Sequence, residues 1–428
     1  MASKKGDNDS NDPRNCWKVK FNFRRFNMNK KISAAVASAA LVLGASSAAN
    51  AGIIVPAGEW TLDFNGNVNA YASFYDADDA NTASITGGLA GTQDSSGESD
   101  SYSIGTGLLP SWLGVTGTTR QNDVDVSFTI SIQPNASDNG FTGDGAHSSS
   151  VNSSVLARQA FLTFGDASWG SVKLGKDLGI FASDAILNDM TLLGVGSGGN
   201  ISGSALNTTN GGIGTGYIYA AWKGQVAYTT PNMNGFQATV GITNPNQFGT
   251  TNNAAHQDTF GLEAKASYSF AQGKIWASAA KYEIKANQGG NDYDVDAYDL
   301  GVNFNAGNVG VTAYVYTGEG AGTTFLGAYG ADSSGNERDS DGGYLQATYV
   351  LPTGTKLGAA YGISNLDLAT GESASALVEE NKRWTVGAYH PLTKHLNLVA
   401  EFTDLQSESH DNSTNDSTKV SLGAILFF

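Results

Sequence analysis

The regular alternation of apolar and polar side chains most constrains how this chain can fold. The alternation is strict in Val124–Ile132 and Phe260–Phe270, and it recurs in Phe236–Ile242 and Leu396–Phe402. A period of two is typical of β-strands that bury one face and expose the other to a different environment. No long stretch of helical periodicity competes with it, so the sequence predicts an all-β fold.

The links between these segments alternate between short and long. Residues 271–272 and 352–354 form short links, whereas 177–216 and 318–341 are long and mostly polar. One rim of the sheet should therefore carry tight turns and the other loops, as in transmembrane barrels with short periplasmic turns and long external loops. We predict sixteen antiparallel strands between residues 58 and 428, with most long links as solvated tips.

The last ten residues have the pattern of a strand that closes a barrel. Val420, Leu422, Ala424, Leu426 and Phe428 share one parity. In a closed barrel the last strand pairs with the first, so the terminus is held in place instead of fraying. We therefore predict an outer-membrane barrel, with Phe428 as an assembly signal for the barrel-assembly machinery.

The first 51 residues have the features of a targeting segment. Lys30 and Lys31 precede a small-residue apolar run from Ile32 to about Ala48, which Ala49-Asn50-Ala51 follows. A charged region, an apolar run and an A-x-A site are typical of a secretory signal peptide. The run is too short and too rich in Ala and Ser for a membrane helix. We predict cleavage after Ala51 and a single barrel domain over 52–428.

The charge balance argues against a nucleic-acid partner. The chain has 24 Lys and Arg and 40 Asp and Glu, of which residues 1–51 hold nine and three, so 52–428 carries 15 − 37 = −22. Such acidity favours cation attraction. The only cysteine, Cys16, precedes the predicted cleavage site, so the mature chain needs no disulfide.

Three stretches resemble the trimeric general porins of Gram-negative outer membranes. Ala157–Lys176 is similar to the family's Arg-Gln-Ala-aromatic … Gly-x-Val-x-Leu-Gly-Arg segment, Tyr228–Phe236 to its Tyr-x-Ser-Pro hairpin, and Val386–His395 to a Tyr-x-Leu-Ser-Lys turn. Lys176 replaces the family's arginine, and residues 52–428 contain only four arginines. The resemblance implies a homotrimer in outer-membrane lipid and lipopolysaccharide, with the third external loop folded into the pore.

The longest link, 177–216, corresponds to that third loop. Its apolar residues, such as Leu178, Phe181 and Leu192, make it too hydrophobic to extend into water, so we expect it to pack inside the barrel. Asp177, Asp184 and Asp189 would then line the constriction as its acidic side.

Strand parity and the resemblance predict the charged residues of the pore wall. The basic ones are Arg158, Lys173, Lys223, Lys265 and Arg383, and the acidic ones are Asp123, Asp125, Glu263 and Glu401. Rings of opposite charge across a narrow pore select ions. Arg158 is assigned by resemblance alone, because its parity matches the outward Leu162 and Phe164; a β-bulge or a subunit interface could explain this.

Other signals are weaker. Trp60, Trp169, Trp276, Phe427 and Phe428 lie near short-turn ends and predict an interfacial aromatic girdle. The aspartates of Asn291–Asp296 lack the glycine and final glutamate of a calcium loop. We expect them at the outer rim, where divalent bridging to lipopolysaccharide stays open. The histidines show no metal spacing, and no cofactor is expected.

These observations predict a non-enzymatic, passive diffusion channel for small hydrophilic solutes and ions, with a preference for cations, in the outer membrane of a Gram-negative bacterium. A substrate-selective porin of the same fold is the alternative within the transport class. An outer-membrane hydrolase and a surface anchor are the alternatives outside it.

Overall fold

The computed structural model describes residues 52–428 apart from 79–82, 94–96, 135, 137–154, 199–207, 246–257 and 286–290. The predicted signal peptide and its cleavage site lie outside the described residues. Within the described ranges, no helix is both long enough and apolar enough to span a membrane.

The described residues form antiparallel strands joined by turns and loops. The strands are β1 Ile53–Ala57, β2 Trp60–Ala77, β3 Asp100–Gly105, β4 Trp112–Gln121, β5 Val124–Gln133, β6 Leu156–Asp166, β7 Gly170–Leu178, β8 Trp222–Thr229, β9 Phe236–Thr243, β10 Gly261–Phe270, β11 Gly273–Ile284, β12 Tyr293–Ala306, β13 Val309–Glu319, β14 Asp339–Val350, β15 Lys356–Leu366, β16 Val378–Pro391, β17 Leu396–Ser409 and β18 Thr414–Phe427. Helix α2 spans Ser183–Asn188, and the 3-10 helix η2 spans Met190–Leu193.

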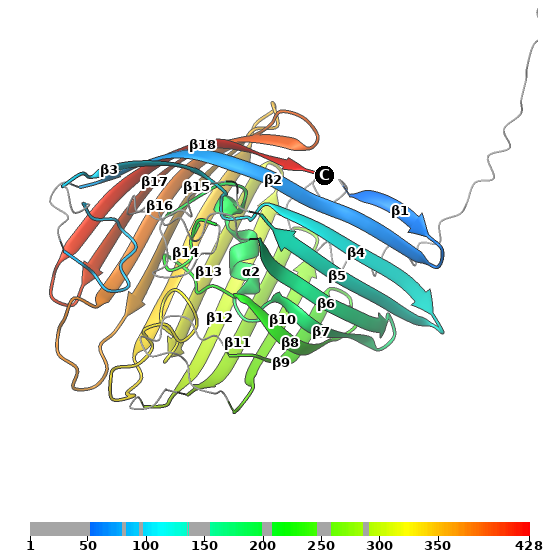
Figure 1. The fold of residues 1–428 in the computed structure, drawn as a ribbon, viewed down its shortest axis with the longest axis horizontal. Helices are drawn as coiled ribbons and strands as arrows, with labels where there is room; N and C mark the ends of the chain where they lie inside the picture. Colours follow the sequence, from blue (N-terminus) through cyan, green and yellow to red (C-terminus); the bar gives the residue numbers. More distant parts are fainter. Residues whose placement is uncertain are drawn as a thin grey trace, which may run out of the picture. The chain divides into compact units, whose positions relative to one another are not determined.

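These eighteen strands of the described chain occupy sixteen positions in a closed sheet. β3 and β4 share one position, because they pair in turn with the two halves of β2. β1 and β18 share another, since β1 pairs with the first residues of β2 and β18 with the rest. Each remaining strand pairs with its sequence neighbours, which confirms the predicted sixteen-stranded antiparallel barrel (Figure 1).

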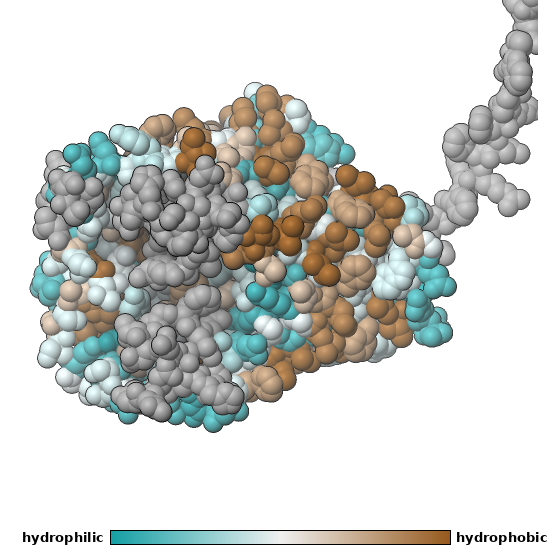
Figure 2. Space-filling view, viewed as in Figure 1, coloured by the Kyte–Doolittle hydropathy of each residue, from teal (hydrophilic) through white to brown (hydrophobic). Residues whose placement is uncertain are grey.

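The period-two pattern gives the barrel its two faces. Val240, Leu262 and Leu300 are 50–55% exposed on the outer face. Residues of opposite parity include polar side chains that bond across the inner face, as Thr116 does with Thr129 and Thr385 with Thr403. Figure 2 shows hydrophobic residues gathered in a band over the strands in view, with hydrophilic residues beyond it at the turn end. This outer band matches a lipid-facing surface.

The tight turns use residues that tolerate a left-handed backbone. Asn122 (φ 48°) and Asp123 (φ 63°) connect β4 and β5. Two successive positive φ values are typical of a two-residue type I′ hairpin turn, whose twist matches that of the flanking strands. Gly307 (φ 59°) serves the same purpose between β12 and β13. Turn chemistry thus fixes the register of each hairpin.

The barrel closes where β18 pairs with β2. Leu426 lies opposite Val68, and the hydroxyls of Ser421 and Ser73 are 2.8 Å apart. The N–H of Phe428 donates to the Gly66 carbonyl at 3.0 Å, and the Gly66 N–H donates to the Phe428 carbonyl at 2.9 Å. The terminal residue is therefore held in the wall, as predicted.

The predicted aromatic girdle is wrong for two of its members. Trp276 is 1% exposed and Phe427 is 5% exposed, because both face the interior. Trp276 fits there because its cross-strand partner is Gly301, where any side chain would collide with the indole ring. Trp169, at 40% exposure, keeps the outer position expected of a girdle residue.

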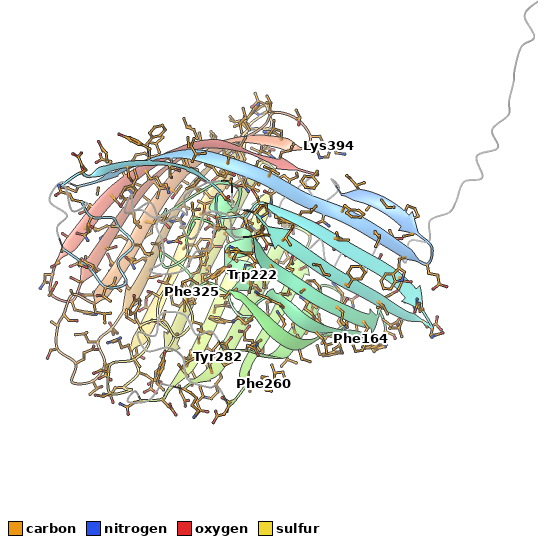
Figure 3. The ribbon with its side chains drawn as sticks, viewed as in Figure 1. Phe164, Trp222, Phe260, Tyr282, Phe325 and Lys394 are labelled. Atoms are coloured by element: carbon orange, nitrogen blue, oxygen red, sulfur yellow. The ribbon has the colours of Figure 1, made fainter. Side chains whose placement is uncertain are left out.

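The prediction that most long links are solvated tips also needs correction. Residues from the links after β3, β7 and β13, among them Leu108, Phe181 and Phe325, join aromatic strand residues in one buried cluster. The apolar side chains of these links explain the burial. Figure 3 shows Phe325 and Trp222 toward the middle of the sheet and Phe164 and Phe260 at its periphery.

Candidate functional site

The link between β7 and β8, residues 179–221, is buried over most of the part that the structure describes; we call it the β7–β8 segment. Phe181 is 1% exposed and Ala185 is fully buried. It contains α2 and η2, and Asp189 caps η2 by accepting a hydrogen bond from the Thr191 N–H at 2.9 Å. Its buried apolar side chains, such as Phe181 and Ile186, belong to the buried cluster described above.

Glu263 of β10 holds the beginning of the β7–β8 segment. Its Oε2 accepts hydrogen bonds from the N–H groups of Ile180 (2.6 Å) and Phe181 (2.9 Å). Its Oε1 lies 2.7 Å from the Lys223 ammonium and also bonds the Tyr282 hydroxyl. The carboxylate is 1% exposed. Glu263 is therefore buried and anchors backbone, whereas the sequence analysis expected it on an open pore wall.

Glu401 of β17 holds the middle of the segment in the same way. Its Oε2 accepts from the N–H groups of Val195 and Gly196, both at 2.8 Å, and its Oε1 accepts from the Tyr389 hydroxyl at 2.7 Å. β10 and β17 are 17 − 10 = 7 positions apart among sixteen. The two carboxylates thus fix the segment to nearly opposite parts of the sheet.

Asp184, on α2, meets two lysines from neighbouring strands. Its carboxylate lies 2.9 Å from the Lys265 ammonium and 2.5 Å from that of Lys274. Lys265 also donates to the Ser183 hydroxyl at 2.9 Å. The lysine side chains are about a quarter exposed, whereas Asp184 is buried. The structure therefore brings Asp184 and Lys265 together, and it adds Lys274, which the sequence analysis missed.

Arg383 and Asp189 form a second charged contact on the segment. The guanidinium Nη2 lies 3.9 Å from the Asp189 carboxylate, which accepts a hydrogen bond from the Tyr217 hydroxyl at 2.8 Å. Arg383 is 1% exposed because Gly196 and Gly212 of the segment approach it so closely that a side chain at either would collide with it. These glycines allow the segment to lie against the arginine.

Asp177 and Lys173 lie together at the end of β7, before the segment begins. Both face inward and form an ion pair, and the Gln159 amide donates to Asp177 at 3.1 Å. Lys173 also lies 4.9 Å from the centre of the Phe161 ring. Asp177 was predicted as a loop residue, but the strand continues through it to Leu178.

A β-bulge explains the parity conflict of Arg158. Ile132 pairs with Ala157, but Ser131 pairs with Gln159, so Arg158 is the extra residue and the register shifts there. Arg158 is 5% exposed, and its backbone N–H donates to the Gln133 side chain at 3.0 Å. An extra residue reverses the parity of the strand on one side of it.

The remaining predicted acids of the wall lie away from the β7–β8 segment. Asp123 is exposed within the β4–β5 turn. Asp125 lies 2.7 Å from the Arg120 guanidinium, which also binds Asp166 at 2.8 Å, all at the tight-turn rim. The ion pair of Asp125 is thus with Arg120 and not with a residue of the β7–β8 segment.

Neutral side chains of the wall also bind the segment, and the sequence analysis did not identify them. Gln346 accepts from the Met190 N–H (2.8 Å) and donates to the Asn188 carbonyl (2.7 Å). Tyr344 donates to the Ala185 carbonyl at 2.8 Å. Their inward parity could have suggested them, but a polar uncharged side chain gives no signal for which backbone group it will bind.

Two of the three aspartates of Asn291–Asp296 pair with lysines. Asp296 lies 2.8 Å from Lys281, and Asp292 lies 3.1 Å from Lys285. Among the residues that the structure describes, no group of three His, Cys, Asp or Glu side chains could hold a metal ion. Divalent bridging by these aspartates therefore stays a prediction.

An ion pair links two loops at the loop rim. Arg338 donates to both oxygens of Glu372, at 2.8 Å and 2.5 Å. These hydrogen bonds lower the pKa of Glu372 below its ordinary value, more than its partial burial raises it. The stabilisation is therefore complete above the ordinary pKa and is lost as the pH falls through the lowered one.

We expect the stability difference between the wild type and Glu372→Gln to stay constant between pH 7 and pH 5. It should shrink only below about pH 4. Denaturant midpoints at several pH values measure it. A difference that already vanishes near pH 6 would contradict the prediction.

The chain belongs to the Gram-negative porin family, whose model matches residues 35–410. No curated protein sequence matches it. Among solved structures, it is similar to the outer membrane channel DcaP of Acinetobacter baumannii, with 17% identity, a TM-score of 0.64, and coverage of 88% of this chain and 100% of that one. The match to the family model confirms the family that the sequence resemblance predicted. The chain is therefore an outer-membrane channel for passive diffusion and not an enzyme.

Two further structures share the fold. OmpF of Salmonella typhi, solved in complex with daunomycin, is 16% identical with a TM-score of 0.56. OmpT of Vibrio cholerae is 15% identical with a TM-score of 0.55. Each alignment covers 88% of this chain and 100% of the other. At these identities the similarity concerns the fold, so the finer properties of the channel depend on its own residues.

Proposed function

We propose that this porin is a narrow diffusion channel that prefers cations and acts as a homotrimer, with the β7–β8 segment as its constriction. The observation that carries the proposal is the attachment of that segment to Glu263 and Glu401, on nearly opposite strands. A segment held at both places crosses the interior and leaves only part of the cross-section for water and solutes.

The charge distribution supports a preference for cations. Residues 52–428 carry a formal net charge of −22 by the count given above, which concentrates cations at the channel mouth. Inside, Asp184 offsets one of the two positive charges of Lys265 and Lys274. Without this carboxylate, both ammonium charges would stand uncompensated by it.

Asp184→Asn should shift the channel toward anions, because it leaves two lysines without their shared counter-charge. The reversal potential in a planar bilayer under a salt gradient measures the shift, and we expect its sign to move toward anion preference. Asp367→Asn, at an exposed position just after β15, is the matched control. An unchanged reversal potential in a folded Asp184→Asn channel would refute the assignment of Asp184 to the constriction.

A homotrimer is supported by the similarity to the OmpT structure described as a trimer form, at 14% identity and a TM-score of 0.53. Contacts with lipopolysaccharide and with the barrel-assembly machinery are further parts of the proposal. The mass of the protein in mild detergent tests the trimer. A monomeric protein that conducts ions would refute the trimer, but the proposed channel function would stand.

A substrate-selective channel is the second candidate, and the buried aromatic side chains favour it. Tyr217, Tyr314 and Tyr344 pack ring against ring in the interior, with centroids 5.6–5.7 Å apart. A wide, unspecific pore has no need for such filling. Flux measurements with a series of neutral and charged solutes distinguish the candidates, because only a selective channel should favour one solute over others of equal size.

A further inference from the structure

The link between β13 and β14, residues 320–338, has two halves of opposite character; we call it the β13–β14 segment. In its first half, Ala321, Phe325 and Leu326 are at most 1% exposed. In its second half, Ser333 and Ser334 form an exposed tip. External loops of a barrel are ordinarily solvated. The first half instead enters the interior, where it contacts the β7–β8 segment.

The two segments are joined by both backbone and side chains. The Tyr219 N–H donates to the Thr324 carbonyl at 2.9 Å, and the rings of Tyr219 and Phe325 meet edge to face at 5.7 Å. A side chain at Gly214 would collide with Leu89 and contact Thr324. Three links, those after β2, β7 and β13, therefore converge at this point.

Each converging link has its own attachment to the wall. The N–H of Leu89 donates to the Ser407 hydroxyl at 2.8 Å and to the Asn381 side chain at 3.1 Å. The Tyr293 hydroxyl of β12 donates to the Gly327 carbonyl at 2.6 Å. Because the links are held from different strands, their meeting point lies across the interior and not along one side of it.

Arg338 closes the base of the β13–β14 segment. Its guanidinium donates to the carbonyls of Tyr329 and Ala331, both at 2.8 Å, and to Glu372. Its backbone bonds Gly330 and Gly320 on the other side of the loop, at 2.7 Å and 3.0 Å. The buried Arg338 thus joins the two ends of the β13–β14 segment and binds the segment to the link after β15.

We infer that residues 320–330 form a second constriction element, which limits solute size together with the β7–β8 segment, and that Arg338 is its positioning residue. The inference rests on the proposed function, because it requires that the interior conducts. Phe325 is the residue of this element that determines size, since it is the largest buried side chain among residues 320–330.

The test is the single-channel conductance and the solute size limit of Phe325→Ala in planar bilayers and liposomes. Removing the ring should raise conductance about twofold and admit larger neutral sugars, because it widens the narrowest part of the path. Phe260→Ala is the matched control, since Phe260 is 65% exposed on the periphery. That variant should behave as the wild type.

Arg338→Gln provides a second, independent variant if Phe325→Ala does not fold. It keeps the buried apolar contacts but removes the charge that holds Glu372, so we expect frequent steps to a higher conductance level. Arg338→Lys should make these steps rarer, so that the channel again stays mostly at the wild-type conductance level. Unchanged conductance and size limit in folded Phe325→Ala or folded Arg338→Gln would overturn the inference. A wild type that does not conduct would instead refute the proposed function.

Discussion

Glu263→Gln should both destabilise the barrel and raise its conductance. The substitution leaves the Lys223 ammonium, which is 4% exposed, without its counter-charge. Removing one partner of a buried ion pair costs about 3–5 kcal/mol. The same change weakens the bonds from the Ile180 and Phe181 N–H groups, because a neutral amide oxygen is a poorer acceptor than a carboxylate.

Denaturant midpoints measure the loss of stability. In single-channel recordings, release of the β7–β8 segment should appear as a larger and noisier current. Glu319→Gln, at the exposed end of β13, is the matched control. Combining Glu263→Gln with Lys223→Met should recover part of the lost stability, because no buried charge then remains, but not the original current. A Glu263→Gln channel as stable and as quiet as Glu319→Gln would show that the anchor has no such role.

Deleting Phe428 should remove most of the folded protein from the outer membrane. In the barrel the deletion removes two backbone hydrogen bonds to Gly66 and the contact between the Phe428 ring and that glycine. Each hydrogen bond contributes about 1 kcal/mol net, so the folded barrel itself should lose only about 2 kcal/mol. A much larger loss in cells would then reflect recognition of the terminus during assembly.

The comparison of two measurements separates these effects. The amount of heat-modifiable protein in isolated outer membranes reports assembly, and refolding into detergent reports the intrinsic cost. Phe260→Ala controls for the loss of an aromatic side chain. If the deletion lowers both quantities equally, Phe428 acts only as the end of a strand and not as a signal.

The strands and the inward side of most charged residues could be predicted from the sequence, because lipid on one side of a barrel enforces the period of two. Parity gave the wrong side for Arg158, because a single bulged residue opposite the Ser131–Ile132 step reverses the parity of the strand. The sequence gives no marker for such a bulge. Parity likewise shows that Trp276 alternates, but only the cross-strand partner Gly301 explains why the ring turns inward.

Contacts within the interior were harder to foresee. The sequence placed Glu263 and Glu401 on the inner face but could not show that backbone N–H groups would cover them. Such contacts depend on where a long link lies in space, which local patterns do not encode. The β13–β14 segment shows the same limit, because its few apolar residues, such as Phe325 and Leu326, are flanked by threonines and glycines that suggest a solvated loop.

The pairing of β2 with β18 means that the barrel can close only after the last strand has been synthesised. The hydroxyls of Ser73 and Ser421 meet at 2.8 Å although 348 residues separate them. Until the last strand has emerged, every intermediate is a sheet with two unpaired edges, and such edges invite pairing with other chains. A nascent or truncated chain is therefore prone to aggregate. The full-length chain depends on chaperones on its way to the membrane until the barrel has closed.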